Sequence, residues 1–338
     1  MEKIFLNRNE NYCGPSLPVL KAVRNAKPQY LNMYIDGYYN SILLDALSKK
    51  FKLSNKQIAL NYGGEDFFRA VFNCRVKNVL TSQFHFYYHD EYFKSTNIKL
   101  HTFKMYEKSN DWFFDIDDLV KQYKKIKPEI ILIASPNNPT GNILKYADIL
   151  KILKTISSST VFIFDNAYYG FDNASDYQKI EQLLKKFPNF VILRTFSKFY
   201  ALAGLRASYA LGSQNMKKML GYQDYYLGMS RIMENTALAA LNSEKYYKAS
   251  AQTITKEREK FITSLKKMKF FKPYNSGGNF VLVRINQKAV KTFKKALSGQ
   301  RIVLYKDVTD DLIRVTVNKS EYMAKFVEIL KKIDKSLS

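Results

Sequence analysis

The chain has few cysteines, glycines and prolines, and each shortage excludes a class of protein. Its 338 residues include two cysteines, Cys13 and Cys74, which cannot build a disulfide framework and suit a reducing compartment. The 13 glycines and 8 prolines leave no room for a low-complexity linker. No stretch reaches the roughly 18 apolar residues of a membrane span, and the first residues lack the apolar segment of a signal peptide. We therefore expect a cytoplasmic protein with no membrane partner.

Histidine is also scarce, which argues against a metal site. Of three histidines, His85 and His89 have the i, i+4 spacing of a helix, but no third ligand cluster accompanies them. We expect no metal.

Acidic residues are outnumbered, since 30 Asp and Glu face 54 Lys and Arg, for a formal net charge of +24. Such a charge suits nucleic acid, acidic membranes or phosphorylated ligands. However, the lysines are scattered through helical patterns such as 117–127 and 259–269 and form no single block. They fit solvated helix faces, so we expect no nucleic-acid partner.

Short, very apolar runs alternate with amphipathic stretches in the first two thirds of the chain. The runs 129–134, 160–165 and 190–195 each end abruptly in polar residues, and helical periodicity fills 145–156 and 176–187. This alternation predicts an α/β domain with a mainly parallel sheet flanked by helices. Ligands of such sheets bind at the carboxyl ends of the strands, where the polar residues would gather.

After about residue 225 the pattern changes to a long helix, short alternating strands and a terminal helix, which predicts a smaller α+β domain. We expect a large domain over 28–228 and a small C-terminal domain over 229–338. The segment 1–27 is expected to join the small domain.

Two loops are suited to hold a ligand. In "NYGGEDFFRAVF" (61–72), two glycines open a helix whose first N–H groups can bind a phosphate. The alternative is a Gly-Gly turn that starts the helix and binds no ligand. In "SPNNPTG" (135–141), two prolines and a glycine hold the asparagine side chains rigidly at a strand end. An ordinary Asn-Pro loop is the alternative.

The strand ends also carry an acid and an amine. Asp165 closes one buried run and needs a cationic partner, which can be a protein cation or the ring nitrogen of a bound heterocycle. Lys198 follows the next run, 33 positions later, a spacing that suits neighbouring strand ends. Arg206, eight residues after Lys198, can bind an anion with two hydrogen bonds. Pyridoxal 5'-phosphate (PLP) needs this set: a lysine, an acid for its pyridinium and a phosphate site.

The motifs "SPNNPTG", "DNAYYGF" and "RTFSKFYALAGLR" together resemble the class I and II, fold type I PLP-dependent aminotransferases, of the histidinol-phosphate aminotransferase type. The resemblance covers nearly the whole chain, including a substrate segment at 6–16 and a carboxylate-binding strand at 312–317. It implies a fold type I PLP-transferase. It also implies Lys198 as Schiff-base lysine and proton carrier, and Asp165 on the pyridine nitrogen. Tyr168 and Asn138 would bind the ring 3'-oxygen.

The same resemblance implies how the rest of the cofactor is held. The phosphate ligands would be the backbone of Gly64 and Glu65 with Thr195, Ser197 and Arg206. Tyr34 would reach the phosphate of a neighbouring subunit, which implies a homodimer. The aromatic residue that stacks on the ring lies within 85–87, and we place Phe86 ahead of His85 and Tyr87.

For the substrate, the resemblance implies Asn11 and Gly14 in the N-terminal segment and Arg314 on the α-carboxylate. Tyr305 stands where the family has an arginine for the histidinol phosphate group, and Lys306 follows it. We therefore expect an aminotransferase that uses glutamate and a small phosphorylated keto compound. A PLP-dependent decarboxylase of a small phosphorylated amino acid is the alternative. Asn166 also departs from the family, which has Glu after the ring-nitrogen acid.

Overall fold

A computed structural model of the chain describes residues 3–34, 41–72, 76–86, 88–172, 175–305 and 308–338. In these residues seven strands form a central sheet in the order β2-β10-β9-β8-β7-β3-β4. They are β2 (Ile58–Asn61), β3 (Asn78–Ser82), β4 (Lys99–Phe103), β7 (Ile130–Ala134), β8 (Val161–Asp165), β9 (Phe190–Thr195) and β10 (Ser208–Leu211). Every pairing is parallel apart from the two made by β10. The predicted mainly parallel α/β sheet is confirmed.

Helices cover both faces of this sheet. Successive residues of a strand point to opposite sides, so the apolar strands place hydrophobic side chains on both faces. On β7, Ile131 and Ile133 belong to one buried cluster with residues of α7, while Ile130 and Leu132 belong to another with residues of α4 and α8. The helices around the sheet are α3 (Ile42–Phe51), α4 (Gly64–Phe72), α5 (Tyr88–Lys94), α6 (Ile116–Ile126), α7 (Tyr146–Thr155), α8 (Met216–Leu220) and α9 (Arg231–Leu241). Short 3-10 helices span η2 (Asn55–Gln57), η3 (Ser175–Lys185) and η4 (Ala203–Leu205). The strands are therefore buried on both sides, as their continuous apolar runs require.

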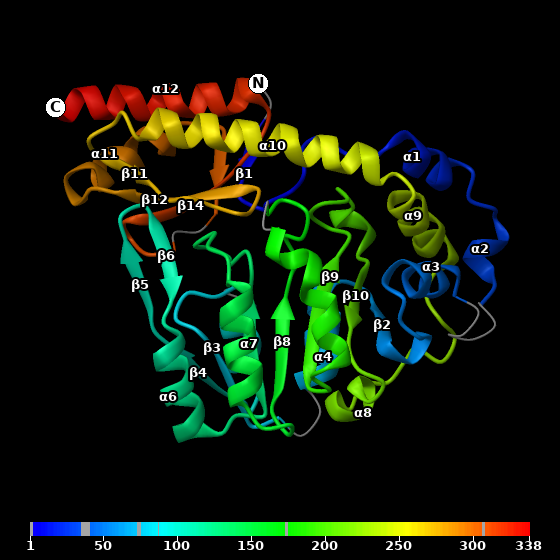
Figure 1. Cartoon of the computed structure of the whole chain (residues 1–338). Helices are drawn as coiled ribbons and strands as arrows, with labels where there is room; N and C mark the ends of the chain where they lie inside the picture. Colours follow the sequence, from blue (N-terminus) through cyan, green and yellow to red (C-terminus); the bar gives the residue numbers. More distant parts are fainter. Residues whose placement is uncertain (1–2, 35–40, 73–75, 87, 173–174, 306–307) are drawn as a thin grey trace.

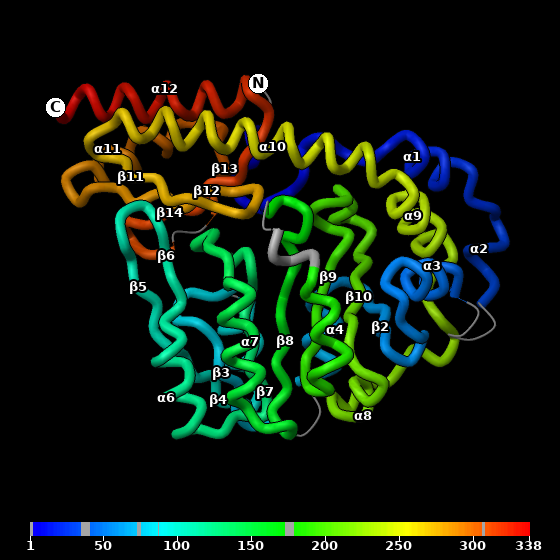
Figure 2. Tube along the Cα trace, in the orientation of Figure 1, coloured from blue at the N-terminus to red at the C-terminus, as the bar shows by residue number. Residues whose placement is uncertain are grey.

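A second, antiparallel sheet lies over one end of the first. It consists of β11 (Phe271–Pro273), β12 (Phe280–Ile285) and β14 (Leu312–Thr316). The helices around it are α10 (Glu244–Leu265), α11 (Gln287–Ser298) and α12 (Ser320–Leu337). Figures 1 and 2 show α10 running across the top of the molecule beside α12, and in Figure 1 the arrow of β8 points toward this second layer. The carboxyl ends of the parallel strands thus face the small sheet.

The N-terminal segment connects to both parts. β1 (Ile4–Leu6) pairs in parallel with β13 (Ile302–Leu304), and α1 (Leu17–Arg24), which precedes α2 (Gln29–Asn32), packs against α9. The first strand therefore joins the C-terminal part, while the exact domain boundaries remain predictions.

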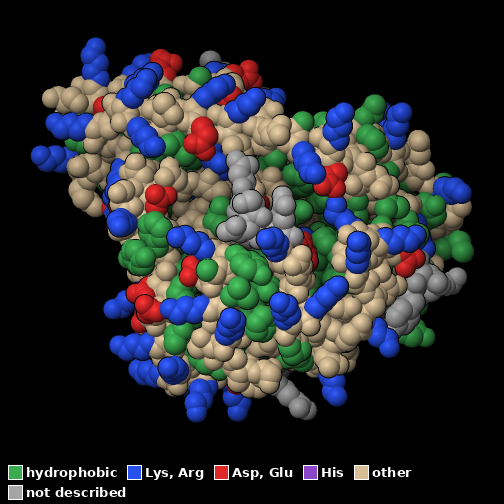
Figure 3. Space-filling model, viewed as in Figure 1, with side chains coloured by type: hydrophobic (Ala, Val, Ile, Leu, Met, Phe, Trp, Pro, Cys, Tyr) green, Lys and Arg blue, Asp and Glu red, His purple; other side chains and the backbone are tan. Residues whose placement is uncertain are grey.

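The surface is basic in many places. Figure 3 shows Lys and Arg side chains spread over the visible face without one continuous block. In the part of the chain that the structure describes, no helix has the length and apolar composition needed to cross a bilayer. The cytoplasmic location stays a prediction.

Among the contacts between the small sheet and the large domain, one comes from a hairpin and another from the turn 135–141. The hairpin β5 (Met105–Lys108) and β6 (Asp111–Phe114) carries Glu107, which forms ion pairs with Lys272 and Arg284. In the second contact, the backbone N–H of Gly277 donates to the carbonyl oxygen of Gly141 at 2.8 Å. Gly141 has φ +78°, and a Cβ there would lie 2.5 Å from Ser276 Oγ and 2.9 Å from Ser276 Cα. The turn 135–141 therefore accepts only glycine at its end.

We predict that Gly141→Ala lowers the free energy of unfolding by about 2–3 kcal/mol, because the new methyl group meets the backbone of Ser276 and the residue must keep a positive φ. Urea unfolding followed by circular dichroism measures the loss. Gly299→Ala is the matched control, since a Cβ at Gly299 meets nothing within 4 Å, and its effect should stay within about 0.5 kcal/mol. Equal stabilities of the two variants would contradict the contact.

Candidate active site

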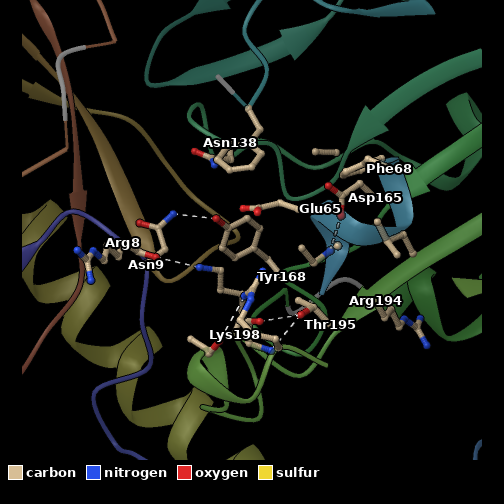
Figure 4. A pocket seen from close by; sticks show the side chains of 18 of the residues that line it. Arg8, Asn9, Glu65, Phe68, Asn138, Asp165, Tyr168, Arg194, Thr195 and Lys198 are labelled. Carbon is tan, nitrogen blue, oxygen red and sulfur yellow. Dashed lines mark hydrogen bonds between the residues drawn. The ribbon is translucent and has the colours of Figure 1, made fainter. Parts of the chain in front are cut away.

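A cavity of about 380 Å³ opens at the carboxyl ends of β7, β8 and β9, beneath the small sheet. Its wall comes from segments far apart in the sequence: residues 7–9, the start of α4, the strand ends, and the region of β13 and β14. Figure 4 shows the side chains of Lys198 and Tyr168 near its centre. The polar runs that close the apolar strands therefore meet at one edge of the sheet, as their sequence pattern predicts.

The predicted amine and acid both line this cavity. Asp165 is the last residue of β8 and pairs in register with Leu193 of β9, and Lys198 follows the end of β9 by three residues. The Lys198 Nζ donates to the carbonyl oxygen of Arg8 at 2.9 Å. Desolvation lowers the pKa of Lys198 to about 8, and the positive charges of Arg314 and Arg206 act in the same direction. Burial raises the pKa of Asp165 to about 6.

Next to this pair lies a site suited to an anion. Gly64 and Glu65 begin α4 and line the cavity, so N–H groups of the first helical turn are at its wall. Thr195 and Ser197 form a hydroxyl pair, in which the Ser197 N–H donates to Thr195 Oγ1 at 3.0 Å and the two hydroxyl oxygens are 2.9 Å apart. Arg206 also lines the cavity. These donors are of the kind that binds a phosphate.

A glycine makes room for the arginine of this site. Gly63 has φ +91°, and a Cβ there would lie 2.6 Å from Nη2 of Arg206. The guanidinium therefore packs on the bare backbone in front of α4. An amine, a buried acid and this anion site in one cavity fit PLP.

Three further predicted side chains belong to the cavity wall. Tyr168, Asn138 and Arg314 all line the cavity. The Arg314 Nη1 donates to Asn138 Oδ1 at 2.7 Å, and its Nη2 donates to the carbonyl oxygen of Asn7. The Arg314 guanidinium carbon lies 3.9 Å from the centre of the Tyr305 ring. Arg314 is thus held on three sides by neighbours that keep its charge at the cavity wall.

Of the candidates for ring stacking, Phe86 lines the cavity. His85 instead contacts the carbonyl oxygen of Ser82 at 2.9 Å and Asp90 at 3.1 Å. Tyr87 lies outside the described residues, and so does Lys306. The position of Phe86 agrees with its ranking ahead of His85, while its role stays a prediction.

Three predicted residues do not line the cavity: Asn11, Gly14 and Tyr34. Asn11 is buried and donates from Nδ2 to the carbonyl oxygen of Phe199 at 3.1 Å. Gly14 adopts a left-handed turn with φ +73°, and the Tyr34 side chain is 79% exposed. The predicted roles of these three residues, including the reach of Tyr34 to a neighbouring subunit, stay predictions.

Sequence reasoning missed other residues of the wall. Asn7, Arg8 and Asn9 line the cavity, although the residues chosen from their segment were Asn11 and Gly14. Pairing of β1 with β13 places the residues after β1 here, which is a tertiary contact. Phe68 could have been found, because it lies four residues after Gly64 and so on the same face of α4.

No group of three or more metal-binding side chains occurs among the described residues. The rings of His85 and His89 are stacked 6.0 Å apart, and burial lowers the pKa of His89 to about 3. His89 is therefore a neutral side chain packed among aromatic rings such as Phe68.

We predict that Asp165→Asn stabilises the protein when it is freed of cofactor. Because burial raises the pKa of Asp165 from 3.8 to about 6, the folded state loses stability as the pH rises through this range, and the loss persists at pH 8. Asparagine carries no charge, so the variant should unfold with a free energy up to about 3 kcal/mol larger at pH 8 and equal to wild type near pH 3. Urea unfolding at both pH values measures this difference. A less stable variant at pH 8 would show that the carboxylate is well compensated.

The profile of the family "Aminotransferase class I and II" matches residues 1–330. Among similar proteins, a histidinol-phosphate aminotransferase of Caldicellulosiruptor saccharolyticus is 28% identical over 98% of this chain and 92% of its own length. A histidinol-phosphate aminotransferase 2 of Archaeoglobus fulgidus is 30% identical over 98% of this chain and 93% of its own.

Solved structures share the fold. The histidinol-phosphate aminotransferase of Sinorhizobium meliloti, solved in complex with PLP, superposes with a TM-score of 0.88 at 23% identity, over 99% of this chain and 92% of that one. The L-threonine-O-3-phosphate decarboxylase of Porphyromonas gingivalis gives 0.80 at 16% identity, over 97% and 98%. On the match of the family profile over nearly its whole length, the chain belongs to the class I and II aminotransferases.

Proposed function

We propose that this protein is a PLP-dependent aminotransferase that moves an amino group from glutamate to a small phosphorylated keto compound. The observation that carries the proposal is the convergence of Lys198, Asp165 and the anion site around Arg206 in one cavity. Membership of the aminotransferase family supports the reaction type, and the names of the similar histidinol-phosphate aminotransferases support a phosphorylated substrate.

When bound, PLP supplies an electron sink for the negative charge left on the substrate α-carbon after a proton is removed. The Asp165 carboxylate would face the pyridine nitrogen and hold its proton by charge attraction. Lys198 would attach the cofactor and, once displaced by the substrate amine, carry the proton. Because its pKa is lowered to about 8, a larger fraction of its Nζ is neutral near pH 7 than in a free lysine. Its amine can therefore accept a proton and return it.

The charges of the cavity favour an anionic substrate. Besides Arg206, Arg8 and Arg314 line the cavity, and Arg314 comes from β14 of the small sheet. Arg314 would bind the α-carboxylate of the amino donor, since a guanidinium fork matches a carboxylate with two hydrogen bonds. Tyr305 covers this guanidinium and fills space at the wall. PLP would occupy a large part of the 380 Å³, so the remaining volume suits a short substrate.

We predict that glutamate alone converts the wild-type cofactor to its aminated form, followed by the change in visible absorbance. Arg314→Lys should slow this step about 10- to 100-fold, because the bidentate contact with the carboxylate is lost. Lys198→Ala is the control that lacks the reactive amine. It should fold and keep the cofactor noncovalently, but glutamate should not change its spectrum. After the glutamate step, a short phosphorylated ketone should restore the wild-type spectrum faster than other acceptors.

Two results would overturn this reading. Efficient turnover of histidinol phosphate would contradict the small substrate, and release of carbon dioxide without any aminated cofactor would identify the decarboxylase.

We also propose that two copies of the chain form a homodimer through their N-terminal helices. Large apolar side chains of α1, α2 and the two residues that follow α2 are exposed, and Figure 1 shows α1 and α2 at one edge of the molecule. These side chains are Leu17, Leu20, Val23, Leu31, Met33 and Tyr34. Such a patch is typical of an interface between subunits. Tyr34 would then reach the neighbouring anion site.

We predict that Tyr34→Phe weakens PLP binding about 5- to 10-fold, because one hydrogen bond to the phosphate is lost. Leu31→Asp should convert the dimer to monomers in sedimentation velocity, since it places a charge in the apolar patch. Tyr106→Phe, at another exposed tyrosine, is the matched control and should bind PLP as wild type does. A monomeric wild type would refute the dimer.

A further inference from the structure

Asn9 is a buried side chain of the cavity wall that has no assigned task. It is 1% exposed and has φ +51°, a left-handed conformation that asparagine tolerates better than most residues. Its backbone N–H donates to Thr316 Oγ1 at 2.9 Å, and its carbonyl oxygen accepts from Asn279 Nδ2 at 3.0 Å. The N-terminal segment is therefore pinned to the small sheet at this residue.

The amide side chain of Asn9 lies between two hydroxyl groups. Its Oδ1 accepts from Thr316 Oγ1 at 2.9 Å, and its Nδ2 donates to the Tyr168 hydroxyl at 2.8 Å. Figure 4 shows this second bond on the side of Tyr168 that faces the N-terminal segment. A backbone N–H, a threonine, an asparagine and a tyrosine thus form one chain of hydrogen bonds.

The direction of this chain follows from its first member. A backbone N–H can only donate, so the Thr316 oxygen accepts from it, and the Thr316 hydrogen needs an acceptor of its own. Asn9 Oδ1 is that acceptor. If the amide were reversed, the buried Thr316 hydrogen would lack an acceptor among the described residues, at a cost of about 1–3 kcal/mol. The amide is therefore oriented with Nδ2 toward Tyr168.

Because the Tyr168 oxygen accepts from Asn9, its own hydrogen must point elsewhere. Arg314, which faces Tyr168, is a cation without acceptor capacity, and the Lys198 Nζ lies 6.0 Å from the centre of the Tyr168 ring. The Asp165 carboxylate accepts from the Ala167 N–H at 3.1 Å. Asn9 occupies one side of the Tyr168 oxygen. The Tyr168 hydrogen is therefore left for a partner on the cavity side, where the Glu65 carboxylate also lines the wall and where a ligand would be.

We propose that Asn9 and Thr316 are positioning residues that fix Tyr168 as a hydrogen-bond donor to the 3'-oxygen of the cofactor. This inference rests on the proposed PLP-dependent function. Thr316 lies two residues after Arg314 on β14, so both side chains stand on the same face of that strand. The strand that would bind the substrate carboxylate therefore also sets the direction of the Tyr168 hydroxyl.

The test is the pH titration of the visible absorbance of bound PLP, measured without substrate. A hydrogen bond from Tyr168 stabilises the deprotonated 3'-oxygen, so its loss should raise the midpoint. Asn9→Gly keeps the positive φ and removes the amide, and it should raise the midpoint by about one pH unit. Thr316→Val leaves the amide free to reverse and should raise the midpoint by about half as much.

A double-mutant cycle separates this role from a general disturbance. In a Tyr168→Phe background, both substitutions should leave the midpoint unchanged, because the hydroxyl through which they act is gone. Asn318→Ala is the matched control. Its Nδ2 donates to the carbonyl oxygen of Phe5 at 3.0 Å, so it ties the same two segments without lining the cavity, and it should titrate as wild type does.

Unchanged midpoints in Asn9→Gly and Thr316→Val, with cofactor bound, would overturn the relay and leave the proposed function intact. Equal shifts with and without the Tyr168 hydroxyl would overturn it as well. Failure of the wild type to bind PLP would overturn both the relay and the proposed function.

Discussion

The site depends on one constraint: a buried acid and an amine are held at the ends of adjacent parallel strands. The register of β8 and β9 places Asp165 beside Leu193, five residues before Lys198. Burial raises the pKa of the acid, and desolvation at the cavity wall lowers that of the amine. A sheet buried on both faces has few places for such groups, and the edge where its strands end is one of them. The cavity is built around this pair.

The N-terminal residues 7–9 form a second important part of the cavity wall. Residues 7–9 cross from β1 to the cavity, and the carbonyl oxygen of Arg8 accepts from Lys198 while the carbonyl oxygen of Asn7 accepts from Arg314. The N-terminal segment therefore touches the predicted catalytic lysine and the predicted carboxylate site at once. It is tied to the small sheet through Thr316 and Asn279. A movement of the small sheet would therefore also shift the backbone carbonyl groups that accept from Lys198 and Arg314.

Tyr305, which stands where the related family has an arginine, packs against Arg314. The family resemblance places an arginine at position 305, whereas here a tyrosine ring lies against the guanidinium of Arg314. The exchange removes one positive charge from the substrate end and adds an aromatic wall. Asn166, another departure, accepts from Arg194 Nε at 3.1 Å and donates to the carbonyl oxygen of Ser135, so it supports the loops behind the cavity.

The amino-acid sequence by itself determined the sheet and the residues at its ends. Continuous apolar runs stopping at Asp165 and at Thr195 require a buried parallel sheet, and polar residues at those stops must meet at one edge. Local rules likewise predicted the helix that begins at Gly64. These features follow from neighbours along the chain, which is why they could be read without a structure.

Only the tertiary structure decided which distant segments close the cavity. The sequence pointed to Asn11 and Gly14 in the N-terminal segment, but pairing of β1 with β13 brings Asn9 and its neighbours to the wall. The bond from Asn9 to Tyr168 joins residues 159 positions apart, and the bond from Thr316 to Asn9 joins residues 307 apart. No local pattern specifies such contacts, because they depend on how two sheets pack and on the direction in which each hydroxyl finds its acceptor.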